Sequence, residues 1–213
     1  MALMEMEEIV KKITDRLRWA EKARDNAYVL HRNIIKNAGA AIRAVHRFEK
    51  EEAMRLISEA KEWLAEANRA VQDFREFPIA GFIHDAQKEL VEACFTAAVV
   101  FRTVLPDPDD LQVTYAAYLN GISEVIGELR REILDLMRQD RGEEGEYYLE
   151  VMDDIYCIIA AIDFSDSITG GLRRSTDQAR SILERTRGDF TNYIVGKRLR
   201  DSVSSCAANT AAV

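Results

Sequence analysis

Three acidic side chains near the middle of the chain fall on one face of a predicted helix. At 100° per residue, Asp85, Glu89 and Glu92 lie within about 60° of one another, and an uncharged run of nine residues follows them. Ionised carboxylates held close together in a partly dry site need a basic side chain, a shared proton or a metal ion beside them. The pattern therefore predicts a cation site. The alternative is an ordinary solvated face, neutralised by Lys88 and Arg102.

A second acidic face lies on the helix predicted for residues 111–139. Glu124 and Glu128 share this face, and Gly121 beside it lets another backbone approach closely. The short connection at residues 106–110 predicts that this helix packs antiparallel to the preceding one, which brings the two acidic faces together. Such an all-oxygen ligand set favours Mg²⁺ or Mn²⁺. In the alternative, Glu128 pairs with a neighbouring arginine at the surface. The predicted metal-binding and catalytic set is Glu89, Glu92, Glu124 and Glu128.

The charge of the chain is unevenly distributed. The net charge is −8, but residues 1–50 hold eleven Lys and Arg against seven Asp and Glu, a net +4 that leaves −12 for the rest. Four basic residues of this segment, spaced by 4, 7 and 4 positions, form one helical stripe within about 60°. A phosphate backbone can bind along such a stripe through counterion release, although a solvated, salt-bridged face is the alternative. The predicted nucleic-acid-binding residues are Arg32, Lys36, Arg43 and Arg47.

The chain is predicted to be all-α and to form one domain. Of its 213 residues, 47% are hydrophobic and 31% are charged, which is normal for a folded protein with one sizeable core. There are only three prolines and no run of alternating β-branched residues that would indicate a strand. We expect a bundle of about six to seven helices over residues 1–200, and a disordered Ser- and Ala-rich tail at residues 201–213.

Heptad-like spacing of apolar residues places the helices. Residues 4–23 and 27–48 are expected to form one long helix or two in line, followed by helices over 51–75, 79–105, 111–139, 147–164 and 171–193. The apolar face of the helix over 51–75 includes Trp63 and Phe74, and together such faces exceed what one bundle must bury, which predicts self-association. The buried stripe of the long helix is expected to consist of Leu30, Ile34, Ala38, Ala41, Val45 and Phe48.

Cysteine usage and hydropathy indicate the compartment. Cys94, Cys157 and Cys206 occur without C-x-x-C spacing, which argues against a disulfide framework and against a zinc site. The sequence has no charged n-region followed by an apolar h-region, and no uncharged run long enough to span a bilayer. We therefore expect a cytoplasmic protein with no membrane partner.

Several short strings, taken in order, resemble the translin and translin-associated factor X (Trax) family. The resemblance runs from about residue 24 to residue 193. The strings are LHRNI at 30–34, VHR at 45–47, QKELVEA at 87–93, YLNGI at 118–122, GEL at 127–129 and LRR at 172–174, followed by Asp177.

The resemblance implies an all-α fold of about seven helices, assembled into a closed, octamer-like shell that holds RNA inside. In this family, Trax subunits are Mg²⁺-dependent endoribonucleases, whereas translin subunits bind nucleic acid and lack the full acidic set. Glu89 and Glu92 match the paired glutamates of the Trax motif, and Glu128 matches the glutamate of its Gly-Glu-Leu. Glu124 stands where the family has an aspartate, one methylene shorter, and this departure bears on the geometry of the metal site.

A second departure concerns the assembly. The chain lacks the long insert that eukaryotic Trax carries between its third and fourth helices, which suggests a prokaryotic, archaeal-type member that builds a homo-oligomer from one kind of subunit. RNA is the expected substrate, and single-stranded DNA is an alternative ligand. In the predicted mechanism the metal ion lowers the pKa of a bound water, and Glu128 holds a ligating water or accepts its proton.

Two other functions fit parts of the sequence. A MazG-like nucleotide pyrophosphohydrolase is also an all-α Mg²⁺ enzyme, and its E-x-x-E and E-x-x-D motifs have counterparts in Glu89 with Glu92 and in Glu132 with Asp135. This assignment requires Glu132 and Asp135 to face the same site as the glutamates. In the third interpretation, the protein is a non-catalytic nucleic-acid-binding shell in which the acidic face is structural.

Overall fold

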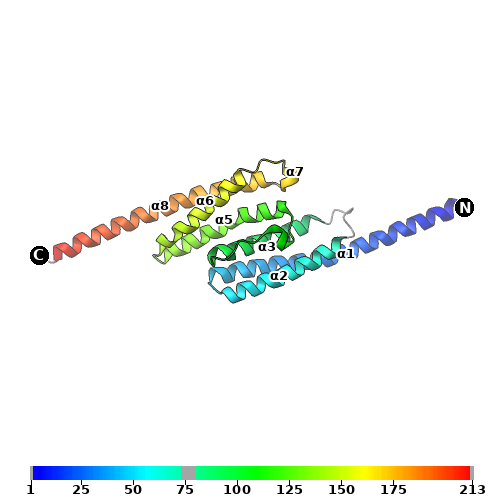
Figure 1. Ribbon diagram of the computed structural model, residues 1–213, viewed down its shortest axis with the longest axis horizontal. Coiled ribbons are helices and arrows are strands. Elements are labelled where there is room, and N and C mark those ends of the chain that lie inside the picture. Colours follow the sequence, from blue (N-terminus) through cyan, green and yellow to red (C-terminus); the bar gives the residue numbers. More distant parts are fainter. Residues whose placement is uncertain (1, 73–79, 212–213) are drawn as a thin grey trace. The chain divides into compact units, whose positions relative to one another are not determined.

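The computed structural model describes the backbone of residues 2–72 and 80–211. Every regular element in these ranges is helical, which confirms the all-α prediction and the long N-terminal helix (Figure 1). None of these helices combines the length and the apolar composition that crossing a lipid bilayer requires. The elements are α1 (Ala2–His46), α2 (Lys50–Val71), α3 (Ala80–Val100), α4 (Pro108–Leu111), α5 (Tyr115–Arg138), the 3₁₀ turn η2 (Gly142–Gly145), α6 (Glu146–Ala160), α7 (Asp166–Thr169) and α8 (Leu172–Ala211).

The chain contains two compact units, residues 1–121 and 122–213, and the boundary between them falls inside the unbroken helix α5. In the first unit, α1 packs against both α2 and α3, and α2 also contacts α3 (Figure 1). In the second unit, α6 packs along α8. The expectation of one domain over residues 1–200 stays a prediction.

The core of the first unit follows the predicted stripe of α1 closely. Leu30, Ile34 and Val45, together with the alanines at 38 and 41, are buried. Phe48 departs from the prediction, because it follows the end of α1 and its side chain is 55% exposed. In α2, Leu64 is fully buried and Trp63 is half-buried, whereas Phe74 lies outside the described residues.

Four helices end on a residue other than glycine in the left-handed conformation. Phe48, Arg102, Gln112 and Asp140 have φ between 53° and 59°. At each, two backbone hydrogen bonds reach back to the last turn; after α1, for example, Phe48 N donates to Val45 O at 2.8 Å and Glu49 N donates to Ala44 O at 2.9 Å. These Schellman motifs supply hydrogen-bond donors to carbonyl groups that have no partner within the helix. They end α1 and α3 before the last residues that apolar periodicity had assigned to them.

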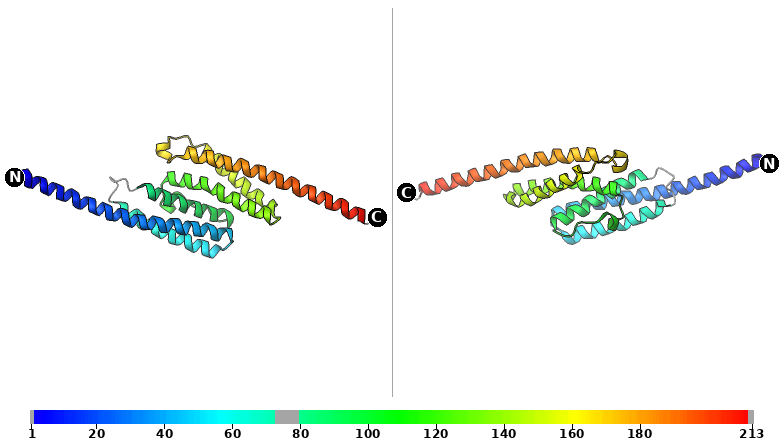
Figure 2. Two further views of the ribbon diagram at one scale, coloured as in Figure 1. Left: turned by 180° about the vertical axis from the view of Figure 1, so that it is seen from behind. Right: turned by 45° about the horizontal axis from the view of Figure 1, so that its top comes forward.

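Both terminal helices are longer than their neighbours. In α1, the segment before Ala20 contains no buried residue among those with described side chains, and it extends beyond α2 and α3 (Figure 2). In the second unit, α8 extends beyond α6 and remains helical to Ala211, where the sequence predicted disorder from residue 201 (Figure 2).

Ion pairs join the helices of the second unit. Arg130 of α5 donates to Thr186 Oγ1 at 3.0 Å and to Asp189 Oδ2 at 2.7 Å on α8. Arg187 of α8 reaches Asp153 of α6 at 2.6 Å. These pairs are only partly exposed and link helices that are distant in sequence, so they contribute more to the packing than pairs within one helix do.

We expect Gly121→Ala to destabilise the protein, because the added Cβ would lie 2.7 Å from both Lys88 O and Val91 Cβ. Overpacking of this kind costs about 1–3 kcal/mol. Gly127→Ala on the same helix is the matched control: its Cβ meets nothing within 4 Å, so better helix propensity should stabilise it by about 0.5–1 kcal/mol. Urea unfolding measures both free energies, and equal shifts for the two variants would contradict the close approach at Gly121.

Candidate functional site

Three of the four predicted glutamates converge. One carboxylate oxygen from each of Glu89, Glu92 and Glu124 lies within 4.8 Å of the others, and all three side chains are half-buried. Glu89 and Glu92 occupy successive turns of α3, and Glu124 is on α5. We call these three residues the carboxylate cluster.

Local packing of α3 and α5 explains why these side chains meet. On α3, Leu90 and Val91 are fully buried, so the flanking positions 89 and 92 carry the glutamates at the margin of the core. On α5, Gly121 lies against the Lys88 carbonyl and Val91, where no side chain would fit. Because α5 is an unbroken helix, Glu124 follows one turn after this contact.

A buried glutamine also fixes the start of α5, and the sequence analysis did not identify it. Gln87 Oε1 accepts hydrogen bonds from Thr114 N and Thr114 Oγ1, both at 3.1 Å. Thr114 Oγ1 in turn accepts from Ala117 N in the first turn of α5. A glutamine among apolar residues on a helix is the sequence signal that could have indicated this contact, but its partner is 27 positions away and cannot be read from spacing.

Glu128 lies outside the carboxylate cluster. It is one turn beyond Glu124 on α5, and its side chain is 24% exposed. Its Oε2 lies 4.0 Å from Arg131 Nη1, which is the neighbouring arginine that the alternative interpretation named. Glu128 is therefore near the cluster in sequence and on the same helix face, but it is not one of the three converging groups.

The electrostatics of the cluster favour a cation. Two unit charges about 5 Å apart repel by roughly 3–4 kcal/mol at an effective dielectric constant of 20, so positive charge from a basic side chain or from an ion stabilises carboxylates that lie within 4.8 Å of one another. The donors are all oxygen, which suits Mg²⁺ or Mn²⁺. Two oxygens bound to one Mg²⁺ lie at most about 4.2 Å apart, so the observed spacing needs only small side-chain rotations to fit an ion.

Cys94 does not offer an alternative nucleophile. It is on α3, two residues after Glu92, and is 7% exposed. Burial raises the pKa of the Cys94 thiol to about 11, because the apolar surroundings disfavour the thiolate. At neutral pH this side chain is a protonated, packed thiol.

The basic stripe is divided by the end of α1. Arg32, Lys36 and Arg43 are exposed on α1, and within the described part of the chain none of them forms an ion pair. Arg47 follows the helix end, and its Nε and Nη2 donate to the two carboxylate oxygens of Glu49 at 2.8 and 2.5 Å. This bond lowers the pKa of Glu49 and raises the pKa of Arg47. Three members are thus available for an anion, and the fourth is engaged.

The residues that the MazG-like alternative requires do not join the cluster. Glu132 is 3% exposed, and Asp135 accepts a hydrogen bond from Arg138 Nη1 at 3.1 Å. Neither belongs to the group of converging carboxylates found in the described residues. The geometry therefore gives no support to a site built from two E-x-x-E/D motifs.

Comparison with known proteins identifies similar chains. No protein-family model matches the sequence. The chain is 32% identical over 183 residues to the uncharacterized protein MJ0175 of Methanocaldococcus jannaschii, covering 85% of this chain and 81% of that protein. The solved structure of AfC3PO in complex with duplex RNA has a TM-score of 0.79 at 31% identity, and a crystal structure of AfC3PO has 0.77 at 32%; each match covers 88% of this chain and 97% of the other. Apo-NeC3PO, at 15% identity and a TM-score of 0.77, shares the fold.

Proposed function

This chain belongs to the translin and Trax family, and from that premise we propose that it is an RNA-binding protein. The main support is its similarity to AfC3PO, which has been solved with duplex RNA and which it matches over 97% of that chain. Arg32, Lys36 and Arg43 are exposed on α1 and form no ion pair among the described residues, which agrees with such a ligand. A polyanion binds mainly through phosphate contacts of this kind.

The proposal extends to catalysis by a metal-dependent endoribonuclease. The observation that carries it is the carboxylate cluster, in which Glu89, Glu92 and Glu124 converge without a His or Cys among them. In this proposal these three side chains hold one Mg²⁺, or Mn²⁺ in its place. The chemistry that such an ion supplies is polarisation of a phosphoryl oxygen and a lower pKa for a coordinated water.

The side chains of the site have separate roles in this scheme. The three clustered glutamates each offer a carboxylate oxygen as a ligand, and these oxygens lie within 4.8 Å of one another. Glu128, one turn along α5, is placed to hold a water or to accept a proton from it. The longer side chain of Glu124, in place of the aspartate of the family, gives its carboxylate one more rotatable bond with which to reach that point.

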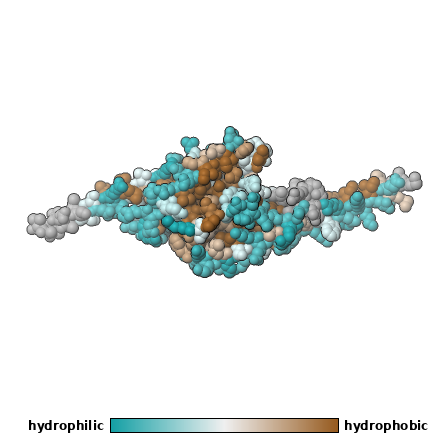
Figure 3. Space-filling model, viewed as in Figure 1, coloured by the Kyte–Doolittle hydropathy of each residue, from teal (hydrophilic) through white to brown (hydrophobic). Residues whose placement is uncertain are grey.

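We also propose that the chain forms a homo-oligomer, an octamer-like shell around the RNA. On one face of the projecting part of α1, the apolar side chains are each at least 50% exposed: Met6, Ile9, Val10, Ile13 and Leu17. They cover an arc of about 100°, and Figure 3 shows a hydrophobic strip along this segment. On α8, Val195, Leu199 and Val203 form a second exposed stripe. Apolar stripes of this length are typical of helices that pack against another chain.

Replacing a cluster carboxylate by its amide should abolish cleavage. Glu89→Gln or Glu92→Gln keeps the side-chain volume but removes a charge that holds the ion, so we expect Mg²⁺-dependent cleavage of labelled RNA to fall at least about 100-fold while RNA binding is retained. Asp85→Asn, on an exposed position of α3 outside the cluster, is the control and should cleave normally. Normal cleavage by both glutamine variants would refute the carboxylate cluster as the metal site, whereas no cleavage by the wild type would leave a non-catalytic RNA-binding protein.

Neutralising two members of the stripe should weaken RNA binding without sequence preference. For Arg32→Gln with Lys36→Gln we expect similar losses of affinity for unrelated RNAs, and a plot of log affinity against log salt that is shallower by roughly one unit or more. Cleavage at saturating RNA should change much less. As a control, Arg55→Gln with Lys61→Gln removes two charges from α2. If the stripe variant has wild-type affinity and salt slope, RNA binds elsewhere.

An acidic residue in the α1 stripe should disrupt the assembly. We expect light scattering at micromolar concentration to report a large particle for the wild type and a smaller one for Ile13→Asp, because the charge would be buried in a subunit contact. Met4→Asp places the same charge on the opposite face of α1 and should have no effect on particle mass. A monodisperse monomer for the wild type would refute self-association.

A further inference from the structure

The first unit contains a polar hollow of about 450 Å³ that the carboxylate cluster does not explain. It lies where the C-terminal part of α2 and the segment between α4 and α5 meet α3. Among the described residues that line it, none is acidic. Four side-chain amides, one guanidinium and one hydroxyl provide its polar lining; they belong to Asn68, Gln72, Gln87, Gln112, Arg69 and Thr114, and we call this site the amide hollow.

Gln87 gives the hollow one hydrogen-bond donor that no described residue uses. The residue is 5% exposed, and its Oε1 is fully used by Thr114 N and Oγ1. Within the described residues, its Nε2 has no hydrogen-bond partner, yet it is not among the fully buried orphan atoms. The amide nitrogen therefore faces the hollow, held in place by the two bonds to its oxygen.

Asn68 gives the hollow a complementary acceptor. Its Nδ2 donates to the backbone carbonyl of Gln112 at 3.1 Å, so the amide plane is fixed and Oδ1 is directed away from that bond. Gln112 itself is held in the left-handed conformation by the closure of α4. Both amides are thus oriented before any ligand arrives.

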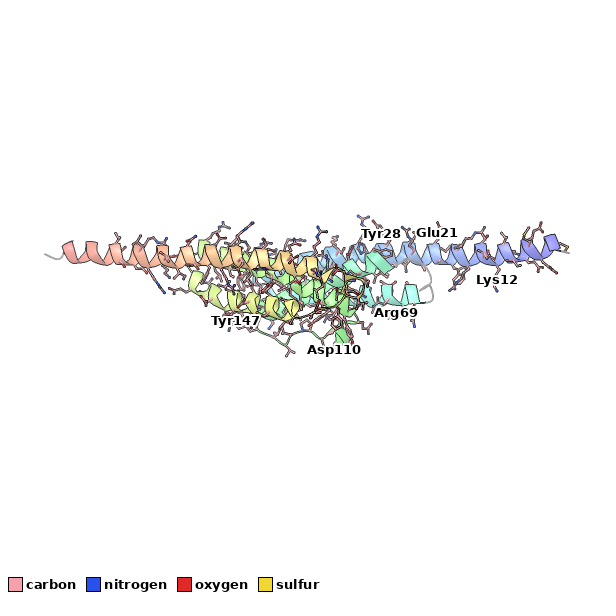
Figure 4. The ribbon with its side chains drawn as sticks, turned by 90° about the horizontal axis from the view of Figure 1, so that it is seen from above. Lys12, Glu21, Tyr28, Arg69, Asp110 and Tyr147 are labelled. Carbon is pink, nitrogen blue, oxygen red and sulfur yellow. The ribbon has the colours of Figure 1, made fainter. Side chains whose placement is uncertain are left out.

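Arg69 adds a positive charge at the rim. It follows Asn68 directly on α2, is exposed, and forms no ion pair within the described part of the chain. Figure 4 labels it on α2 in the first unit. A guanidinium beside two oriented amides can bind a ligand that carries both an anionic group and an uncharged edge with hydrogen-bond donors and acceptors.

We propose that the amide hollow binds one nucleotide, with the base edge at Gln87 Nε2 and Asn68 Oδ1 and the phosphate at Arg69. Every base carries both an acceptor and a donor on its edge, so this pair of groups accepts a base without fixing its identity. The volume lies within the range of small-ligand sites. On α3, Gln87 is about 200° from Glu89, so the site is separate from the carboxylate cluster.

The nucleotide can come from an unpaired end of RNA or from a free mononucleotide. Binding of an RNA end rests on the proposed RNA-binding function, whereas binding of a free mononucleotide does not. The test uses Gln87→Glu, which keeps the acceptor for Thr114 but turns the free donor into a charged acceptor. Gln178→Glu, on an exposed position of α8, introduces the same change outside the hollow. Arg69→Gln removes only the rim charge.

Calorimetry with adenosine 5′-monophosphate and with adenosine gives the first readout. We expect the wild type and Gln178→Glu to bind the monophosphate equally, Gln87→Glu to bind it at least about tenfold more weakly, and the preference of the wild type for the monophosphate over adenosine to disappear in Arg69→Gln. The last result does not depend on a buried substitution, so it remains decisive if Gln87→Glu unfolds.

Fluorescence anisotropy with RNA gives the second readout. If RNA is the source, a duplex with a single-stranded overhang should bind at least about tenfold more tightly than a blunt duplex, and Gln87→Glu should remove this difference while leaving blunt-duplex affinity unchanged. Mononucleotide binding with no overhang preference assigns the hollow to a free nucleotide. If the wild type shows neither mononucleotide binding nor a preference for the overhang, the nucleotide proposal for the amide hollow is overturned. If the wild type binds the mononucleotide but no RNA, only the proposed RNA-binding function is overturned.

Discussion

The absence of a side chain at Gly121 is the constraint on which the candidate site depends. It allows α5 to lie against the backbone of α3 at Lys88, where a methyl group would be 2.7 Å from the carbonyl oxygen. Because the helices approach so closely here, glutamate side chains from both can reach one point.

Helical periodicity predicted which residues share a face, but not where each helix ends. The buried stripe from Leu30 to Val45 and the shared face of Glu89 and Glu92 follow from residues three or four positions apart. The position of Glu124 beside them was predicted from the short connection before α5, which favours antiparallel packing. Phe48 was misplaced because α1 closes on a left-handed residue that is not glycine, and no composition signal marks such a closure. The bond from Gln87 to Thr114 was missed because it joins positions that only tertiary packing brings together.

Basic side chains along the chain differ in whether an acidic partner neutralises them. In the second unit, Arg130, Arg141 and Arg187 are each held by acidic partners. In the first, the arginines near the α1–α2 connection are also neutralised, whereas Arg32 and Lys36 have no ion-pair partner among the described residues. A protein with a net charge of −8 can thus retain a local surface that attracts polyanions, since attraction at short range depends on unpaired charge within a Debye length.

The helical structure of the projecting segment of α1 depends on the rest of the helix. About 18 residues of a single helix, without a neighbour in their own unit, lie near the length at which an isolated helix is only marginally stable in water. Helix there propagates from the packed part of α1, so its outermost turns fray unless another surface covers their apolar side. Where the proposed self-association supplies that surface, order at this end of the molecule depends on protein concentration, and dilution alone lowers the helical content of a chain whose core remains folded.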